Sequence, residues 1–128
     1  MKYNKLIPEL SVKDINASKK FYLDLGFNIM YEREEDKFVF LELEGNQIMI
    51  EELNDHWDVG DMEYPFGRGI NISMTVSNIE DIYNKAISCG YKIFLDMEVH
   101  EYRVDDEIIY EHEFLIQDMD GYLLRFND

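Results

Sequence analysis

Cysteine is almost absent from this sequence, since Cys89 is the only one among 128 residues. A single thiol excludes an intrachain disulfide, so folding must depend on a hydrophobic core, which a chain of this length can form. No stretch approaches the roughly 20 consecutive apolar residues of a membrane helix. The first residues, MKYNKLIPEL, also lack the apolar segment of a signal peptide. We therefore expect a cytoplasmic protein.

Basic residues are few as well. Twelve Lys and Arg stand against 28 Asp and Glu, which gives a net charge of -16. This charge repels phosphate backbones and anionic membranes, so neither nucleic acid nor a membrane is expected as a partner. It would attract a cationic small molecule, although such a surface often serves only solubility. Histidine is scarce too: His56, His100 and His112 are the only three, and no two have the spacing of a metal-ligand pair.

The chain does contain aromatic residues in quantity and an internal repeat. Eight Phe, nine Tyr and one Trp must pack in a core, line a pocket or cover an interface. Residues 10–30, LSVKDINASKKFYLDLGFNIM, align with residues 74–94, MTVSNIEDIYNKAISCGYKIF, at a constant offset of 64. Because 64 is half of the chain, the sequence indicates one structural unit used twice.

Each half carries the same order of local signals. An alternating apolar run predicts a strand, and Asp14 or Asn78 then stands where a helix N-cap belongs. Apolar residues at helical spacing follow, until Gly26 or Gly90 ends the helix. Three strand-like runs complete each half. We predict an α+β fold in a single domain, 1–128, with a first module over 1–54, a linker over 55–68 and a second module over 69–128.

Four segments in this order carry a family resemblance: the repeat itself, FYLDLGF, GRGINISMTV and FLIQDMDGYLLRF. With them the chain resembles the vicinal oxygen chelate superfamily, which includes glyoxalase I, extradiol dioxygenases and bleomycin-resistance proteins. The resemblance implies two tandem βαβββ modules that form a curved mixed sheet around a cleft. It also implies a homodimer, because family clefts are commonly completed by a second chain.

The metal-ligand positions of the family's enzymes correspond here to Ile7, Asn71, Arg125 and either Met49 or Glu51. An aliphatic side chain offers no lone pair, and an arginine puts positive charge where a cation would bind. The resemblance therefore implies the metal-free branch, with no metal and no cofactor: an antibiotic-resistance protein that sequesters a bulky cationic or aromatic ligand such as a bleomycin-family drug. The alternative is a metal-dependent lyase, isomerase or dioxygenase of the same superfamily, so enzymatic activity stays open. No catalytic residue is assigned.

The ligand-binding candidates are aromatic, charged or polar residues expected near the cleft: Glu51, Trp57, Tyr64, Phe66, Asn71, Tyr102, Arg103, Glu113 and Arg125. The three linker aromatics either form a stacking wall or cap the core or a dimer contact. Arg125 either enters the cleft, to meet Glu51 or a ligand carboxylate, or reaches across the sheet to a neighbouring acid. The sequence leaves open which face of 108–116 lines the cleft.

Overall fold

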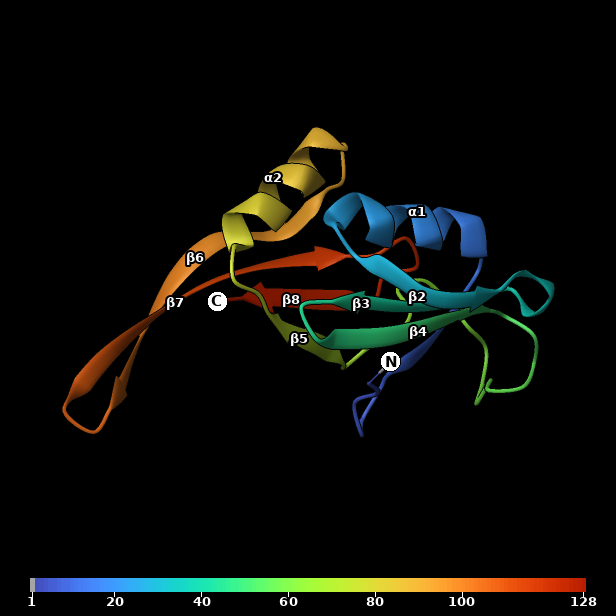
Figure 1. Ribbon diagram of the computed structural model, residues 1–128, viewed down its shortest axis with the longest axis horizontal. Helices are drawn as coiled ribbons and strands as arrows, with labels where there is room; N and C mark the ends of the chain where they lie inside the picture. The colour runs from blue at the N-terminus through green and yellow to red at the C-terminus, as the bar shows by residue number, and fades with distance from the viewer. Residues whose placement is uncertain (1) are drawn as a thin grey trace.

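Two copies of a strand–helix–three-strand unit build the fold of this computed structural model, which describes residues 2–128 (Figure 1). The first consists of β1 (Glu9–Val12), α1 (Ile15–Leu25), β2 (Asn28–Arg33), a 3-10 turn (Glu34–Asp36), β3 (Phe38–Leu43) and β4 (Asn46–Glu52). The second consists of β5 (Asn71–Thr75), α2 (Ile79–Ser88), β6 (Ile93–Val104), β7 (Glu107–Gln117) and β8 (Leu123–Asn127). The predicted α+β fold with two βαβββ modules is thus confirmed.

Each module forms its own four-stranded mixed sheet. The strand orders are β1-β4-β3-β2 and β5-β8-β7-β6, and in both sheets the first strand runs parallel to the last. No strand pairing joins the two sheets anywhere in residues 2–128, so the strands form two sheets and not one continuous curve. Each helix covers one face of its own sheet and leaves the other face open.

The helix boundaries follow from the predicted capping residues. The Asp14 side chain accepts hydrogen bonds from the backbone N–H groups of Asn16 and Ala17, and Asn78 accepts from Asp81. Gly26 ends α1 at φ +110°, a left-handed conformation that a residue with a side chain rarely adopts. The two N-caps are related by the 64-residue offset, which confirms the repeat at the level of single hydrogen bonds.

The two modules are joined through their helices and turns. α1 and α2 lie side by side above the sheets (Figure 1), and the buried apolar residues of both modules form one core. Tyr22 of α1 donates to Asp118 at 2.6 Å, and the Tyr122 hydroxyl donates to the Ser11 carbonyl at 2.9 Å. Because both hydroxyls are withdrawn from bulk water, these bonds fix how the modules sit.

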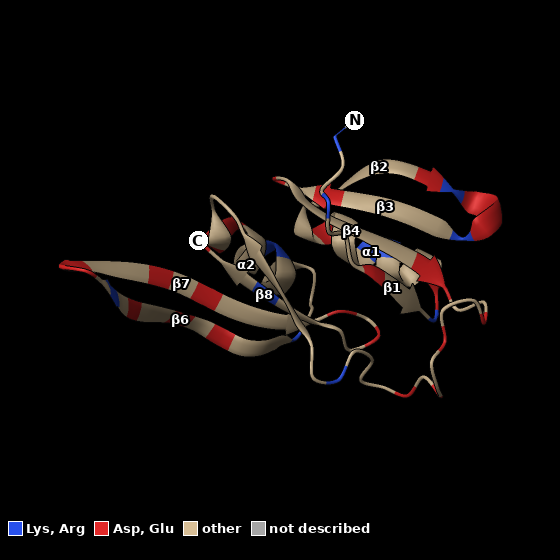
Figure 2. Ribbon diagram, turned by 90° about the horizontal axis from the view of Figure 1, so that it is seen from below, with Lys and Arg blue, Asp and Glu red and all other residues tan. Residues whose placement is uncertain are grey.

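The β6–β7 hairpin extends beyond the rest of its sheet as an arm, here defined as residues 98–113 (Figures 1 and 2). Apolar side chains are exposed on both faces of this arm: Val99, Tyr102, Val104, Ile108, Ile109 and Tyr110. A two-stranded ribbon is only marginally stable in water, and a partner that covers it would stabilise it. No helix in residues 2–128 has the length and apolar character required to cross a bilayer.

Candidate functional site

The open face of the second module carries a chain of polar contacts centred on Arg125. Its neighbours Leu124 and Phe126 are fully buried beneath α2, and strand alternation turns Arg125 to the opposite face. There its Nε donates to Asn71 Oδ1 and its Nη1 to Glu113 Oε1, both at 3.1 Å. Of the two predicted orientations, Arg125 therefore adopts the one that reaches across the sheet to a neighbouring acid.

His100 extends this chain of contacts and was not among the predicted site residues. Its Nε2 lies 3.1 Å from Glu113 Oε2 and 3.2 Å from Glu98 Oε2. The Tyr102 ring lies beside it, with centroids 6.2 Å apart. Glu113 thus links one guanidinium to one imidazole. No group of three or more His, Cys, Asp or Glu within 2–128 has an arrangement that would hold a metal ion.

The open face of the first module is aromatic. Tyr31 stacks on Phe40 with ring centroids 5.4 Å apart, and Phe38 lies 5.8 Å away from Tyr31 on the same face. Tyr3 meets Phe40 edge-on, and the Arg33 guanidinium lies over Phe38 at 4.2 Å from the ring centroid. The face therefore already holds one cation against an aromatic ring.

Two carboxylates adjoin these rings. Glu51 pairs with Phe38 in the β3–β4 register, and its carboxyl group contacts that of Glu9. Burial, and then the hydrogen bond and repulsion from Glu51, raise the pKa of Glu9, while Arg33 opposes the shift. Glu51 also accepts a hydrogen bond from the Asn54 side chain. The first module thus presents negative charge that its own cations only partly offset.

A cavity of about 330 Å³ opens beside Glu51. Its wall is formed by the 3-10 turn, the end of β4 and the start of the linker, with Glu35, Asp36, Glu51 and His56 among its residues. Figure 2 shows the acidic residues that gather at the turn between β2 and β3. Negative charge around a hollow next to an aromatic face is suited to a cationic group attached to a flat ring.

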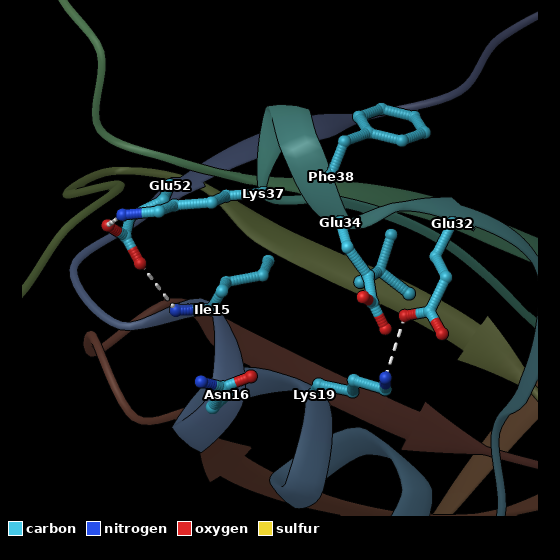
Figure 3. A pocket seen from close by; sticks show the side chains of 9 residues that line it. Ile15, Asn16, Lys19, Glu32, Glu34, Lys37, Phe38 and Glu52 are labelled. Carbon is cyan, nitrogen blue, oxygen red and sulfur yellow. Dashed lines mark hydrogen bonds and ion pairs between the residues drawn. The ribbon is translucent and has the colours of Figure 1, made fainter.

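A second cavity, of about 390 Å³, lies between α1 and the β2–β3 edge (Figure 3). Lys19 pairs with Glu32 at 2.7 Å, and Lys37 pairs with Glu52 at 3.0 Å. Glu52 also accepts from the Ile15 backbone N–H, which is the main reason that its pKa is lowered. Four of the five charged side chains that line this cavity form two ion pairs, and only Glu34 among them has none within residues 2–128, so the cavity is mainly a contact between helix and sheet.

The other predicted site residues lie apart from one another. Trp57 is 64% exposed on the linker, whereas Phe66 is 3% exposed and packs edge-on against Tyr122. Phe66 is thus a part of the interior. Tyr64 lines a third cavity, described below, and Arg103 lies near the tip of the arm, where it donates to the Asp105 carbonyl. The linker aromatics therefore do not form one wall.

Glu51 and Arg125 also belong to different surfaces. The side-chain partners of Arg125 are Asn71 and Glu113, both in the second module, whereas Glu51 contacts Glu9 and Asn54 of the first. The two open faces each form a separate polar or aromatic surface in this chain. The sequence did not indicate that these two surfaces are separate. The arrangement of the modules depends on how the helices pack, and the repeat carries no information about that packing.

Comparisons with known proteins agree with this architecture. Residues 6–43 match a family described as bleomycin resistance protein-like N-terminal. A glyoxalase/bleomycin resistance protein/dioxygenase superfamily member from Vibrio splendidus 12B01 is 35% identical over 94% of this chain and 95% of its own, with a TM-score of 0.45. No curated protein matches. Identity at this level over nearly the full length of both chains establishes a family relationship.

Two further solved structures show the fold. TioX from Micromonospora sp. ML1 has a TM-score of 0.75, with 14% identity over 98% of both chains. A glyoxalase/bleomycin resistance protein/dioxygenase from Alicyclobacillus acidocaldarius has a TM-score of 0.66, with 22% identity over 97% of this chain and 89% of its own. The chain belongs to the vicinal oxygen chelate superfamily, the group of glyoxalases, bleomycin-resistance proteins and dioxygenases.

Proposed function

We propose that the protein binds, without chemical change, a flat aromatic molecule that carries a cationic group, of the bleomycin type. The binding surface is the open face of the first module together with the acidic cavity beside Glu51. The observation that carries this proposal is the position of Glu51 opposite Phe38 on the aromatic face, in contact with Glu9, because stacking surface and negative charge are what such a ligand requires.

Aromatic stacking supplies the first half of the recognition. Tyr3 is 53% exposed and Tyr31 is partly exposed, whereas Phe38 and Phe40 beneath them are buried. The lower rings therefore hold the upper ones in place, and a ligand ring that stacks on Tyr31 would find it already ordered. Preorganisation of this kind lowers the entropic cost of binding.

Charge supplies the second half. Burial is the main reason that the pKa of Glu9 is raised, followed by its hydrogen bond and repulsion with Glu51, and a ligand cation beside the two carboxyl groups would stabilise their charged forms. Binding is therefore expected to lower the pKa of Glu9. The same cation would reach the acidic cavity, where Glu35 and Asp36 face it.

The test is a titration with bleomycin followed by isothermal calorimetry and by the fluorescence of Trp57, which adjoins His56 at the acidic cavity. Glu51→Gln is expected to weaken binding about tenfold, because it removes one charge-assisted contact. The matched control is Glu101→Gln, which removes an equal charge from the arm. A flat titration at micromolar drug, or equal weakening in both variants, would refute the proposal.

The competing enzymatic function is tested on the same material. If the protein only sequesters its ligand, the recovered drug has an unchanged mass and chromatographic retention after long incubation. Elemental analysis of the purified protein then finds no stoichiometric divalent metal. A modified drug, or one equivalent of zinc, iron, nickel or manganese, would favour a metal-dependent lyase or dioxygenase instead.

We also propose that the chain forms a homodimer through the arm. β6 is an edge strand whose pairing with β7 is regular from Glu98 to Val104, so its outer backbone groups are available to another strand. Two copies of one edge pair antiparallel about a twofold axis, which places the apolar β6 side chains of the two copies beside each other, and the interface is complete with two chains.

Light scattering after size-exclusion chromatography tests the dimer. The expected mass is twice the chain mass of 15.3 kDa, and Val99→Lys on β6 is expected to reduce it to that of one chain. Ile87→Lys on α2 is the control, since Ile87 is similarly exposed, at 51% against 59% for Val99, but lies off the arm. A single-chain mass for the parent protein at high concentration would contradict the proposal.

A further inference from the structure

A third cavity, of about 500 Å³, lies at the junction of the two modules. Four segments meet there: α1, the linker, the connection from α2 into β6, and the turn between β7 and β8. It lies apart from the aromatic face of the first module and from the Arg125 contacts of the second. Its volume is within the roughly 300–1,000 Å³ of small-molecule sites.

The inner wall of this junction cavity is aromatic and fixed. The rings of Phe21 and Tyr91 meet edge-to-face with centroids 4.8 Å apart, and Phe21 is almost completely buried. The Tyr91 hydroxyl donates to Asp24 Oδ2 at 2.6 Å, which holds the ring in orientation. A ligand would therefore meet a preformed apolar surface and not a mobile one.

The rim is formed by three apolar side chains that are each about half exposed: Tyr64 at 56%, Phe94 at 52% and Met119 at 48%. The backbone at Tyr64 is held in place, since Arg68 Nη2 donates to its carbonyl at 2.9 Å. The turn opposite includes Gly121 at φ +94°, where a Cβ would come within 2.6 Å of Pro65. Only glycine permits this close packing.

The two charged residues that line the cavity differ in whether their side chains already have partners. Asp118 lines it, but its carboxylate already accepts from the Tyr22 hydroxyl and from the backbone N–H groups of Asp120 and Tyr122. Lys92 also lines the cavity, and among residues 2–128 no carboxylate lies within ion-pair distance of its ammonium group. Lys92 is exposed at the edge of the cavity, so its ammonium group can pair with an anionic ligand that lies against the apolar lining.

From this combination we infer that the junction cavity binds a small aromatic carboxylate. The ring lies against Tyr64 and Phe94, and the carboxylate pairs with the Lys92 ammonium group. Edge-to-face and stacked contacts with these rings orient the ligand ring. The ion pair with Lys92 selects an anion over the cationic ligands that the acidic surface attracts. The two sites thus have opposite charge preferences.

Calorimetric titration with 2-naphthoate tests this inference. Saturable binding with a stoichiometry of one is expected. Lys92→Gln is expected to weaken it about tenfold through loss of the charged contact, and Phe94→Ala is expected to weaken it through loss of stacking. Lys5→Gln is the control, because it changes the net charge equally at an exposed lysine that does not line the cavity. Circular dichroism confirms that each variant is folded.

A cationic probe of the same shape, 2-naphthylmethylammonium, completes the test. It is expected to bind the junction cavity at least tenfold more weakly than 2-naphthoate, by loss of the same charged contact. Saturating bleomycin is expected to leave naphthoate binding unchanged. The experiments can therefore refute this inference without refuting the proposed function, and the reverse. The absence of saturable naphthoate binding, equal weakening by Lys5→Gln, or equal affinity for the two probes would overturn the inference.

Discussion

The two modules share a topology but differ in what their open faces carry. In the first, the short β2–β3 hairpin and the N-terminal residues enclose buried aromatic rings, with Phe40 fully inaccessible. In the second, the equivalent hairpin is lengthened into the arm, and its sheet carries Arg125, Glu113 and His100 in place of rings. The first face is thus an aromatic surface in which Tyr3 and Tyr31 remain accessible over buried rings, and the second is a polar surface with an exposed extension.

This difference shows that the repeat determines the order and pairing of the helices and strands, and little about the side chains on the open faces. Capping residues, helix ends and the parallel pairing of first and last strands are retained in both modules, because each module needs them to close its own sheet. The side chains on the open faces contribute nothing to that closure. They are therefore free to differ, and function is found there.

The largest effect is expected from aromatic residues that occupy matching hairpins. Phe40→Ala in the first module is expected to lower the free energy of unfolding by about 3–5 kcal/mol, since it leaves a cavity under Tyr31 and Tyr3. Tyr110→Ala on the arm, where the ring is 61% exposed, is expected to cost less than about 0.5 kcal/mol. Urea unfolding at low protein concentration measures the free energy of unfolding of both variants. Comparable losses of stability would show that the two hairpins are packed alike.

The next effect concerns the joint between the modules. Burial raises the pKa of Asp118 from 3.8 to about 6, despite its three hydrogen bonds. A folded-state pKa above the unfolded value means that this group adds stability below pH 3.8 and loses it as the pH rises through 6. The shift corresponds to about 3 kcal/mol as an upper bound.

Asp118→Asn removes this titration while keeping a carbonyl oxygen for the two backbone donors. Relative to the parent, the variant is therefore expected to gain stability between pH 3.5 and pH 7. The pKa of Asp120 is also raised by burial, and the comparison of variant with parent cancels its contribution. Denaturant unfolding at a series of pH values measures the difference, and a pH-independent difference would show that the pKa of Asp118 is the same in the folded and unfolded states.

The N-caps offer a smaller but sharper comparison, because Asp14 and Asn78 are repeat equivalents. Asp14 is charged and accepts two backbone N–H groups, whereas Asn78 is neutral and accepts one. Asp14→Ala is expected to cost about 1–2 kcal/mol and Asn78→Ala about 1 kcal/mol. Thermal unfolding of both variants at one pH ranks them, and the reverse order would mean that the helices are not equally coupled to the core.

A smaller effect than at the N-caps is expected at the Arg125 ion pair. Its ion pair with Glu113 is partly exposed on the arginine side, so Arg125→Gln is expected to cost about 0.5–1 kcal/mol. A double-mutant cycle with Glu113→Gln isolates the coupling between the two side chains. A coupling of several kcal/mol would show that this ion pair is shielded from water.

Much of the fold was predictable from the sequence because its signals are local. The 64-residue offset, the caps at Asp14 and Asn78 and the glycine helix ends each report on a few neighbouring residues. The arrangement of the modules was not predictable in this way. It depends on contacts such as Tyr22 with Asp118, which are 96 residues apart and follow no periodic pattern.

The candidate site was less predictable. The sequence brought together Asn71, Glu113 and Arg125, whose contacts follow from adjacent strands, but it missed His100, because the β6–β7 register is set by two irregularities near its start. It also missed the aromatic face of Tyr31, Phe38 and Phe40. The alternation within residues 31–33 and 37–40 does place these rings on one face of their strands. The sequence does not give the register of the hairpin, and it is this register that pairs Tyr31 with Phe40.

The absence of any strand pairing between the sheets in the described residues has a consequence for how such a chain can change over generations. Every backbone ladder closes inside its own half, so a residue gained or lost between Leu53 and Ile70 shifts no register on either side. Duplication could produce this chain, and later divergence could alter one half alone as long as the contacts between the modules, such as Tyr22 with Asp118 and Tyr122 with Ser11, are kept. New binding specificities can therefore arise in one half while the other keeps the molecule folded.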